Sequence, residues 1–253
     1  VREMVEKGMG GGFMHARFGL ETEYLGEEWF ASVAASVSEG KKYGFFSWIY
    51  DEDCWPSGNC AGKTAEVNPE FRVRCLFARR GDAVMPPGAR WEAETTQFLG
   101  CFRMVEEGGG GLRFDEAAES DAGFPDVLAF YCSSWAKLPP STEHYADLMH
   151  DGAMREFIRN SYEPYAERFR KEFGKAIPGI FTDEPQLQTA LPWSLRMPEE
   201  FRKRRGYDLL KKLPHLLFKT AESGKVRHDF WKTVYELFDE SFSAQIGEWC
   251  ERN

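Results

Sequence analysis

The chain has 253 residues, a net charge of −9 and a hydrophobic content of 42%, which is enough for one sizeable core or two small ones. The acidic balance argues against nucleic acid and anionic membrane surfaces as partners. No apolar run approaches the ~18 residues that span a bilayer. These totals therefore exclude both a nucleic-acid-binding protein and an integral membrane protein.

The six cysteines are spread along the chain without a C-x-x-C pair or a Cys/His ligand spacing. Such a distribution predicts free buried thiols rather than a zinc site or a disulfide framework. The chain opens at Val1 inside a helical pattern and ends at Asn253 inside another. We therefore expect a fragment of a longer protein, with any targeting segment outside it.

A helical turn at residues 2–8 leads into a glycine-rich segment, in which Gly11–Met14 is predicted to be a short buried strand. His15 and Arg17 would then emerge at the C-terminal end of that strand. The alternative for His15 is a core histidine that hydrogen-bonds a backbone group. A dinucleotide fingerprint is excluded, because Phe13 stands where the last glycine of G-x-G-x-x-G should fall.

Residues 27–42 carry apolar side chains at helical spacing and predict an amphipathic helix with a charged outer face. The apolar run at residues 45–50 predicts a buried strand. Three acids and a tryptophan follow this strand: Asp51, Glu52, Asp53 and Trp55. Acids in this position form either a solvated loop or a functional site, and the adjacent Trp-Pro makes the two hypotheses about equal.

Residues 71–135 differ in character from the segments on either side. Period-two alternation and several β-like runs are separated by turns rich in glycine and proline. This pattern predicts a small antiparallel insert between two βα units, to which we assign no chemistry. Trp91 and Trp135 are expected to serve packing rather than ligand binding.

Residues 151–169 are predicted to be helical, and Pro164 within this run should kink or split the helix. The apolar run at residues 177–181 is entered through Pro-Gly and predicts a buried strand. Asp183 and Glu184 follow it directly. Both carboxylates are therefore expected at a strand end, where catalytic groups collect in barrels of parallel strands.

Helices that alternate with strands imply a parallel sheet, and three strand ends carry polar or acidic residues. We therefore predict an α/β fold, a partial TIM-type (β/α) barrel with a small antiparallel β insert. A doubly wound sheet also fits the alternation, but no glycine-rich phosphate turn supports it. The predicted domains are residues 1–70 with the first βα units, the insert at 71–135, and 136–253 with further βα units. Exposed barrel edges would allow a homodimer.

Three motifs follow one another along the chain, at residues 11–24, 50–58 and 181–185. They resemble the barrel domain of glycoside hydrolase family 106, the α-L-rhamnosidase-like enzymes, and residues 145–149 and 205–210 are similar to the connecting segments of that family. The resemblance implies a large multidomain bacterial enzyme that removes a terminal rhamnose with inversion, assisted by calcium. Family members are longer, so the remaining catalytic carboxylate and the calcium ligands would lie beyond this chain.

Hydrolysis of a glycosidic bond requires one carboxylic acid to protonate the leaving oxygen and a second to activate water or attack the anomeric carbon. Glu184 is the candidate general acid, and Asp183 is its candidate catalytic neighbour. The candidate substrate-binding residues are His15, Arg17, Asp51, Glu52, Asp53 and Trp55. The structural alternative for Asp183 and Glu184 is a helix cap or a surface ion pair.

The sequence therefore favours a glycosidase that cleaves a terminal sugar, α-L-rhamnose, from a plant or bacterial polysaccharide. Two rival hypotheses remain. In the first, the chain is a non-catalytic sugar-binding or scaffold segment of a larger protein, and its acids serve recognition alone. In the second, Asp51, Glu52 and Asp53 hold the metal ion of a metal-dependent hydrolase.

Overall fold

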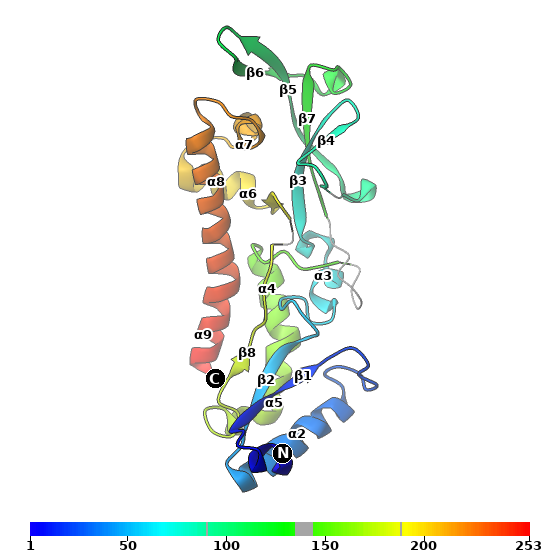
Figure 1. Ribbon diagram of the computed structural model, residues 1–253, viewed down its shortest axis with the longest axis vertical. Coiled ribbons are helices and arrows are strands. Elements are labelled where there is room, and N and C mark those ends of the chain that lie inside the picture. The colour runs from blue at the N-terminus through cyan, green and yellow to red at the C-terminus, as the bar shows by residue number, and fades with distance from the viewer. Residues whose placement is uncertain (90, 135–143, 188) are drawn as a thin grey trace.

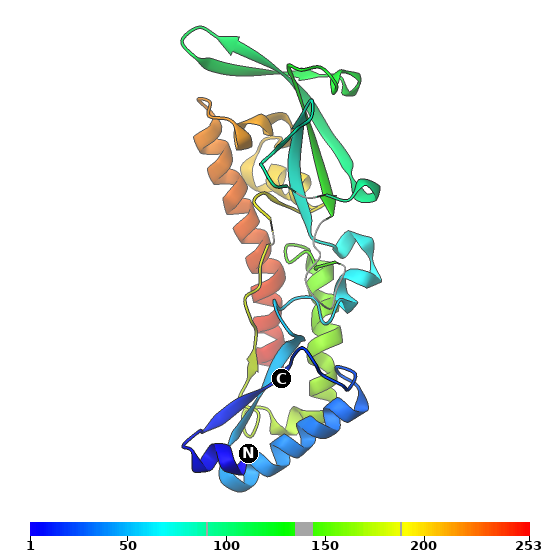
Figure 2. The same ribbon diagram turned by 45° about the vertical axis from the view of Figure 1, so that its right-hand side comes forward.

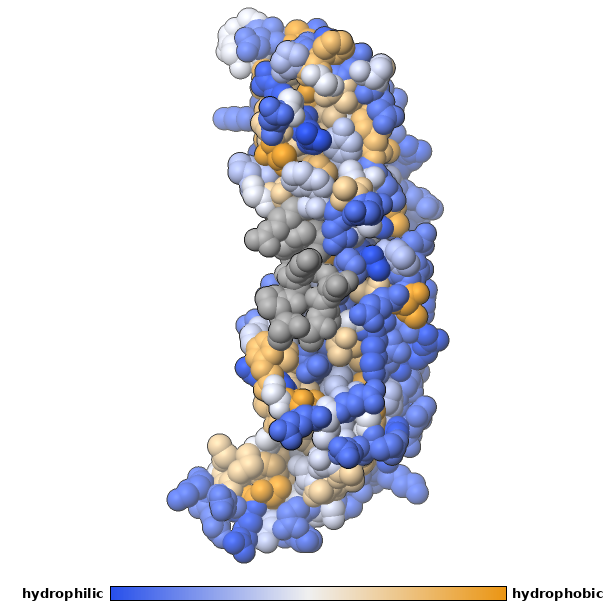
Figure 3. Space-filling model, turned by 90° about the vertical axis from the view of Figure 1, so that its right-hand side faces the viewer, coloured by the Kyte–Doolittle hydropathy of each residue, from blue (hydrophilic) through white to orange (hydrophobic). Residues whose placement is uncertain are grey.

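The computed structural model describes residues 1–89, 91–134, 144–187 and 189–253. The molecule is elongated, with a small parallel sheet near one end, an antiparallel sheet at the other, and a long C-terminal helix running beside both (Figures 1 and 2). Seen from the side in Figure 3, its surface is mostly hydrophilic, with hydrophobic residues in small groups. None of the described helices combines the length and apolar character that crossing a bilayer requires.

The parallel sheet contains the predicted strands that end in polar residues. Its strands are β1 (Gly11–Ala16), β2 (Phe46–Asp53) and β8 (Ile180–Phe181), in the order β1-β2-β8. The helices beside it are α2 (Glu27–Tyr43), α4 (Asp151–Phe157) and α5 (Glu163–Phe169). The register pairs Phe13 with Trp48 and Tyr50 with Phe181. Because the pairing is parallel, the C-terminal ends of all three strands lie at one edge.

The local sequence explains how the helices in this part end. Gly44 caps α2 at a φ of 68°, a left-handed conformation that glycine adopts without a Cβ clash. A π-helical turn at Ile158–Tyr162 separates α4 from α5, and Pro164 lies in the first turn of α5. Proline has no N–H to donate to the carbonyl one turn earlier, which suits the π-helical turn that precedes it. The predicted kink or split appears only as this change of hydrogen-bonding pattern, because the residues around Pro164 keep right-handed helical angles.

The second sheet is antiparallel and contains six strands among the described residues. They are β3 (Arg74–Arg80), β4 (Ala83–Met85), β5 (Gln97–Glu107), β6 (Gly111–Ala117), β7 (Val127–Ser134) and β9 (Pro192–Trp193). The order is β4-β3-β7-β5-β6, and β9 pairs with the start of β3 on the edge opposite β7, the same edge that carries β4 further along. The chain that leaves the parallel sheet after β8 therefore joins the antiparallel sheet.

The remaining helices are α1 (Arg2–Glu6), α3 (Lys63–Val67), α6 (Met197–Arg205), α7 (Pro214–Leu217), α8 (Ser223–Phe238) and α9 (Ala244–Arg252). A π-helical turn at Asp239–Ser243 joins α8 to α9. One hydrophobic cluster includes Ile49 under the parallel sheet, and a second includes Phe130 under the antiparallel sheet. Phe238 of the long helix packs against both clusters.

The predicted partial TIM-type barrel is wrong. The described parallel strands form an open sheet of three, and the larger sheet is antiparallel. The prediction failed because alternation of helix and strand shows that strands pair in parallel, but it does not show how many return to the same sheet. After Phe181 the chain runs to β9 and then into helices, so no fourth strand extends the parallel sheet among the described residues.

The region predicted as a small insert contains β3 to β7, and it forms most of the larger sheet. The predicted domain limits stay a prediction, and the limit between residues 135 and 136 falls outside the described residues. Trp135 also lies outside them. Trp91 stacks on Phe77 with ring centroids 5.1 Å apart. None of the six cysteines forms a disulfide bond, and all but Cys250 are buried.

Candidate functional site

The C-terminal ends of β1, β2 and β8 are joined by backbone hydrogen bonds. The Cys54 N–H donates to the Ala16 carbonyl at 3.0 Å, and the Ser57 N–H donates to the Asp183 carbonyl at 2.8 Å. The loop after β2 therefore holds the ends of β1 and β8 on either side of it. The side chains that lie on these ends form what we term the strand-end cluster: His15, Arg17, Tyr50, Asp53, Trp55, Asp183 and Glu184.

Asp183 accepts a hydrogen bond from the Tyr50 hydroxyl, with 2.5 Å between the phenol oxygen and Oδ2. Burial raises the pKa of Tyr50, and the hydrogen bond to Asp183 raises it further. The phenol therefore stays protonated near neutral pH and acts as the donor. This contact joins a strand-end carboxylate of β8 to the neighbouring strand β2.

His15 lies against the Tyr50 ring, with ring centroids 3.4 Å apart and an angle of 18° between the planes. Its Nε2 lies 2.9 Å from the Cys54 carbonyl oxygen. Because a carbonyl only accepts, Nε2 carries the proton. Burial lowers the pKa of His15, so the ring is neutral near pH 7 and its Nδ1 is an acceptor. The sequence offered, as the alternative for His15, a histidine that hydrogen-bonds a backbone group, and the contact of Nε2 with Cys54 is such a bond.

Arg17 and Trp55 lie together at the outer side of the cluster. The guanidinium carbon is 4.6 Å from the Trp55 ring centroid, and Phe18 meets the same ring edge-on at 5.8 Å. Trp55 remains 38% exposed. A flat aromatic ring beside a cation suits the apolar face and the hydroxyls of a sugar. Since Arg17 covers one face of the ring, a sugar stacking on that face would have to displace it.

Asp51 points away from this edge and into the protein. It is 1% exposed and accepts hydrogen bonds from the hydroxyls of Ser57 at 2.5 Å, Thr182 at 2.6 Å and Tyr162 at 2.7 Å. Burial raises its pKa to about 6, although the three hydroxyls oppose the shift. The carboxylate therefore ties the loop after β2 to β8 and to the π-helical turn.

Glu52 is also turned inward, with 2% of its surface exposed. Its Oε1 accepts the N–H groups of Asp53 and Ala61, and its Oε2 accepts those of Asn59 and Cys60, at distances of 2.6 to 3.0 Å. Burial raises its pKa to about 7 against these bonds. The loop can point its N–H groups inward because Cys60 and Ala61 adopt left-handed φ values of 49° and 55°.

Asp53 is half-buried, and burial raises its pKa. It lies near His15, whose charge state it affects. Glu184 is exposed and adopts a φ of 46°, an unusual conformation for a residue other than glycine. The edge thus carries Asp53, Asp183 and Glu184, whereas Asp51 and Glu52 lie behind it.

Comparison with known families adds a finding for the C-terminal part of the chain. Residues 137–253 match the model of glycoside hydrolase family 106, described as alpha-L-rhamnosidase. The predicted resemblance to this family is confirmed there. The match includes Asp183 and Glu184, and the motifs at residues 11–24 and 50–58 lie outside it. No curated protein matches the chain.

Sequence reasoning missed the side chains that bind Asp183 and Asp51. Tyr50 bonds Asp183, and Thr182 and Tyr162 bond Asp51. Period two along β2 was the available signal for Tyr50, since it places Tyr50 on the face of the sheet opposite Ile49 and Asp51. The bonds to Asp51 come from segments distant in the chain, and no local pattern indicates them.

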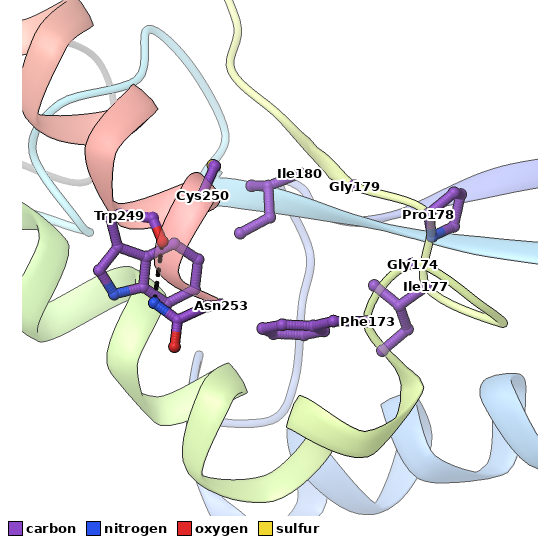
Figure 4. A pocket seen from close by; sticks show the side chains of 9 residues that line it. All are labelled: Phe173, Gly174, Ile177, Pro178, Gly179, Ile180, Trp249, Cys250 and Asn253. Carbon is purple, nitrogen blue, oxygen red and sulfur yellow. Dashed lines mark hydrogen bonds between the residues drawn. The ribbon is translucent and has the colours of Figure 1, made fainter.

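One cavity beside β8 has none of the strand-end cluster in its lining. It has a volume of about 300 Å³ and lies between the segment that enters β8 and the end of α9. Figure 4 shows Phe173, Ile180 and Trp249 pointing into it. Its walls are mostly apolar, and it holds none of the candidate carboxylates. We therefore place the chemistry at the strand ends and not in this cavity.

Calcium, which the family resemblance implies, finds no suitable ligand set in the part of the chain that the structure describes. No group of three or more His, Cys, Asp or Glu side chains there is arranged to hold a metal ion. Asp51 and Glu52 point away from Asp53 and accept hydrogen bonds from the protein. The described residues therefore do not fit the metal site predicted at Asp51, Glu52 and Asp53, and we derive no step through a metal.

Proposed function

We propose that this chain is part of a glycoside hydrolase that removes a terminal α-L-rhamnose from a plant or bacterial polysaccharide. The observation that supports the proposal most is the position of Asp183 and Glu184. They follow β8 within the segment that matches the alpha-L-rhamnosidase family. They also lie at the edge where His15 and Asp53 emerge from β1 and β2.

The proposed reaction uses two carboxyl groups. Glu184, which is exposed, acts as the general acid and gives its proton to the glycosidic oxygen as the bond to the anomeric carbon breaks. Water attacks the anomeric carbon and loses a proton to a second carboxylate. The family resemblance implies a second carboxylate beyond this chain; within the chain, our candidate for that group is Asp183, which lies beside Glu184 at the end of β8. The Tyr50 hydroxyl occupies its Oδ2, which leaves Oδ1 to receive the proton.

The substrate-binding roles divide according to burial. His15, Arg17, Asp53 and Trp55 lie at the edge with surface or polar atoms available to sugar hydroxyls. Asp51 and Glu52, which the sequence also suggested for this role, are buried and saturated with protein hydrogen bonds. For these two acids we propose a structural role in shaping the loop that presents the others.

A non-catalytic sugar-binding segment is the second candidate function. The Trp55 ring, 38% exposed beside Arg17, favours it, because this pair can bind the apolar face and hydroxyls of a sugar without any acid or base chemistry. In this case the strand-end cluster would bind a sugar without cleaving it. The two functions predict different results with the same ligand.

The test measures rhamnose release from methyl α-L-rhamnopyranoside, whose alkoxide leaving group needs protonation, by the full-length enzyme that contains this chain, with methyl β-D-glucopyranoside as the sugar control. The wild type should release sugar from the rhamnoside alone. Glu184→Gln should reduce turnover by at least about 100-fold, since general acids contribute roughly 10²–10⁴ to such rates. Glu106→Gln, an exposed glutamate on β5, is the matched control and should leave turnover unchanged.

Undiminished turnover in Glu184→Gln would remove Glu184 from the mechanism. Absence of turnover in the wild type, with rhamnose binding detected by calorimetry, would establish the sugar-binding alternative in its place.

A further inference from the structure

We infer that Tyr50 is a positioning residue for the proposed reaction, which fixes the orientation of the Asp183 carboxylate through its hydroxyl group. The inference rests on the proposed function and adds a residue to it. Tyr50 comes from β2, and Asp183 follows β8, the neighbouring strand. The contact therefore holds a catalytic candidate in place from an element of regular structure.

The Tyr50 ring has no freedom to turn away. His15 stacks on it with centroids 3.4 Å apart, and Phe181 lies at 5.6 Å with an angle of 26° between the planes. The register pairs Tyr50 directly with Phe181, and Tyr50 is 2% exposed. A ring held between two others keeps its hydroxyl pointing in one direction.

The backbone of Asp183 is held independently of its side chain. Its N–H donates to the Ser57 hydroxyl at 2.8 Å, and its carbonyl accepts the Ser57 N–H at the same distance. The Ser57 hydroxyl in turn donates to buried Asp51. With the backbone fixed, the remaining freedom of Asp183 lies in its side-chain torsions.

The Tyr50 hydrogen bond removes that freedom. It joins the phenol oxygen to Oδ2 at 2.5 Å, so a single orientation of the carboxylate satisfies it. The second oxygen, Oδ1, is then the one left for the proposed reaction. Because the phenol stays protonated near neutral pH, it remains a donor to Oδ2 throughout.

The test compares Tyr50→Phe with wild type in the full-length enzyme that contains this chain, using methyl α-L-rhamnopyranoside. Phenylalanine keeps the stacked ring and removes the hydroxyl alone. We expect kcat to fall by about 10- to 100-fold with little change in KM, since misplacement of a reacting group costs rate rather than affinity. Tyr43→Phe, a 41% exposed tyrosine at the end of α2, is the matched control and should behave as wild type.

A second measurement does not depend on activity. In wild type, the Tyr50 hydroxyl proton should give a slowly exchanging NMR resonance that is missing in Tyr50→Phe and shifted in Asp183→Ala. Two results would overturn the inference about Tyr50 and leave the proposed function standing. They are an unshifted resonance in Asp183→Ala, and an unchanged kcat in Tyr50→Phe when the wild type is active. An inactive wild type would overturn the proposed function, and the catalytic role of Tyr50 with it.

Discussion

Replacement of Glu52 by glutamine tests the idea that this buried carboxylate shapes the loop after β2. Each of its two oxygens accepts two backbone N–H groups. A glutamine side chain keeps one such oxygen and presents an NH₂ group where the other was. Two buried N–H donors then face a donor and have no acceptor.

The expected cost follows from these two donors. A buried donor left without a partner costs about 1–3 kcal/mol, so Glu52→Gln should lower the free energy of unfolding by roughly 2–6 kcal/mol. The whole free energy of unfolding of a native protein is only about 5–15 kcal/mol. The change should therefore be large enough to measure by urea unfolding followed through tryptophan fluorescence.

The measurement is made at about pH 8, where Glu52 is ionised, since burial raises its pKa only to about 7. Glu106→Gln repeats the chemical change on the exposed side of β5 and should cost less than about 0.5 kcal/mol. If Glu52→Gln unfolds at the same urea concentration as this control, the four N–H bonds do not support the loop.

Two further predictions concern the same region. Burial raises the pKa of Asp51 from 3.8 to about 6, so its stabilising contribution is complete below pH 3.8 and is lost as the pH rises through about 6. Relative to Asp51→Asn, the free energy of unfolding of the wild type should fall by up to about 3 kcal/mol across this interval. If urea unfolding gives wild type and Asp51→Asn the same dependence on pH, the raised pKa of Asp51 is contradicted. Gly58→Ala should lower the thermal unfolding midpoint by several degrees, because φ is 128° and a Cβ would lie 2.5 Å from the Leu148 side chain. Gly8→Ala, also left-handed but with no atom within 4 Å of the added Cβ, separates backbone strain from the clash, and equal shifts in both would rule the clash out.

The strands of the parallel sheet were predictable, because their apolar runs are bounded by glycine and proline and end in polar residues. β2 lies at the run 45–50, and β8 covers only the last two residues of the run 177–181. The prediction that these strands are buried is wrong at Phe13 and Phe181, which are 52% and 38% exposed. The number of strands in the sheet was not predictable, since strand partners are chosen by contacts between distant segments. The turn of the chain from β8 to β9 has no local signal that separates it from another βα connection.

The candidate site was predictable as a place but not as an arrangement of side chains. Acids at strand ends indicated the edge where Asp53 and Asp183 lie. The inward direction of Glu52 depends on left-handed φ values at Cys60 and Ala61, residue types that rarely adopt them. The sequence of this loop therefore did not reveal that its N–H groups surround a carboxylate.

The long C-terminal helix has a consequence for how the molecule denatures. Phe230 of α8 belongs to the cluster under the antiparallel sheet, Phe242 of the following π-helical turn belongs to the cluster under the parallel sheet, and Phe238 between them packs against both. Unfolding of either cluster alone would expose to water the apolar side chains that the long helix packs into that cluster. The helix therefore couples the two clusters, so thermal unfolding of both sheets should occur in a single cooperative transition.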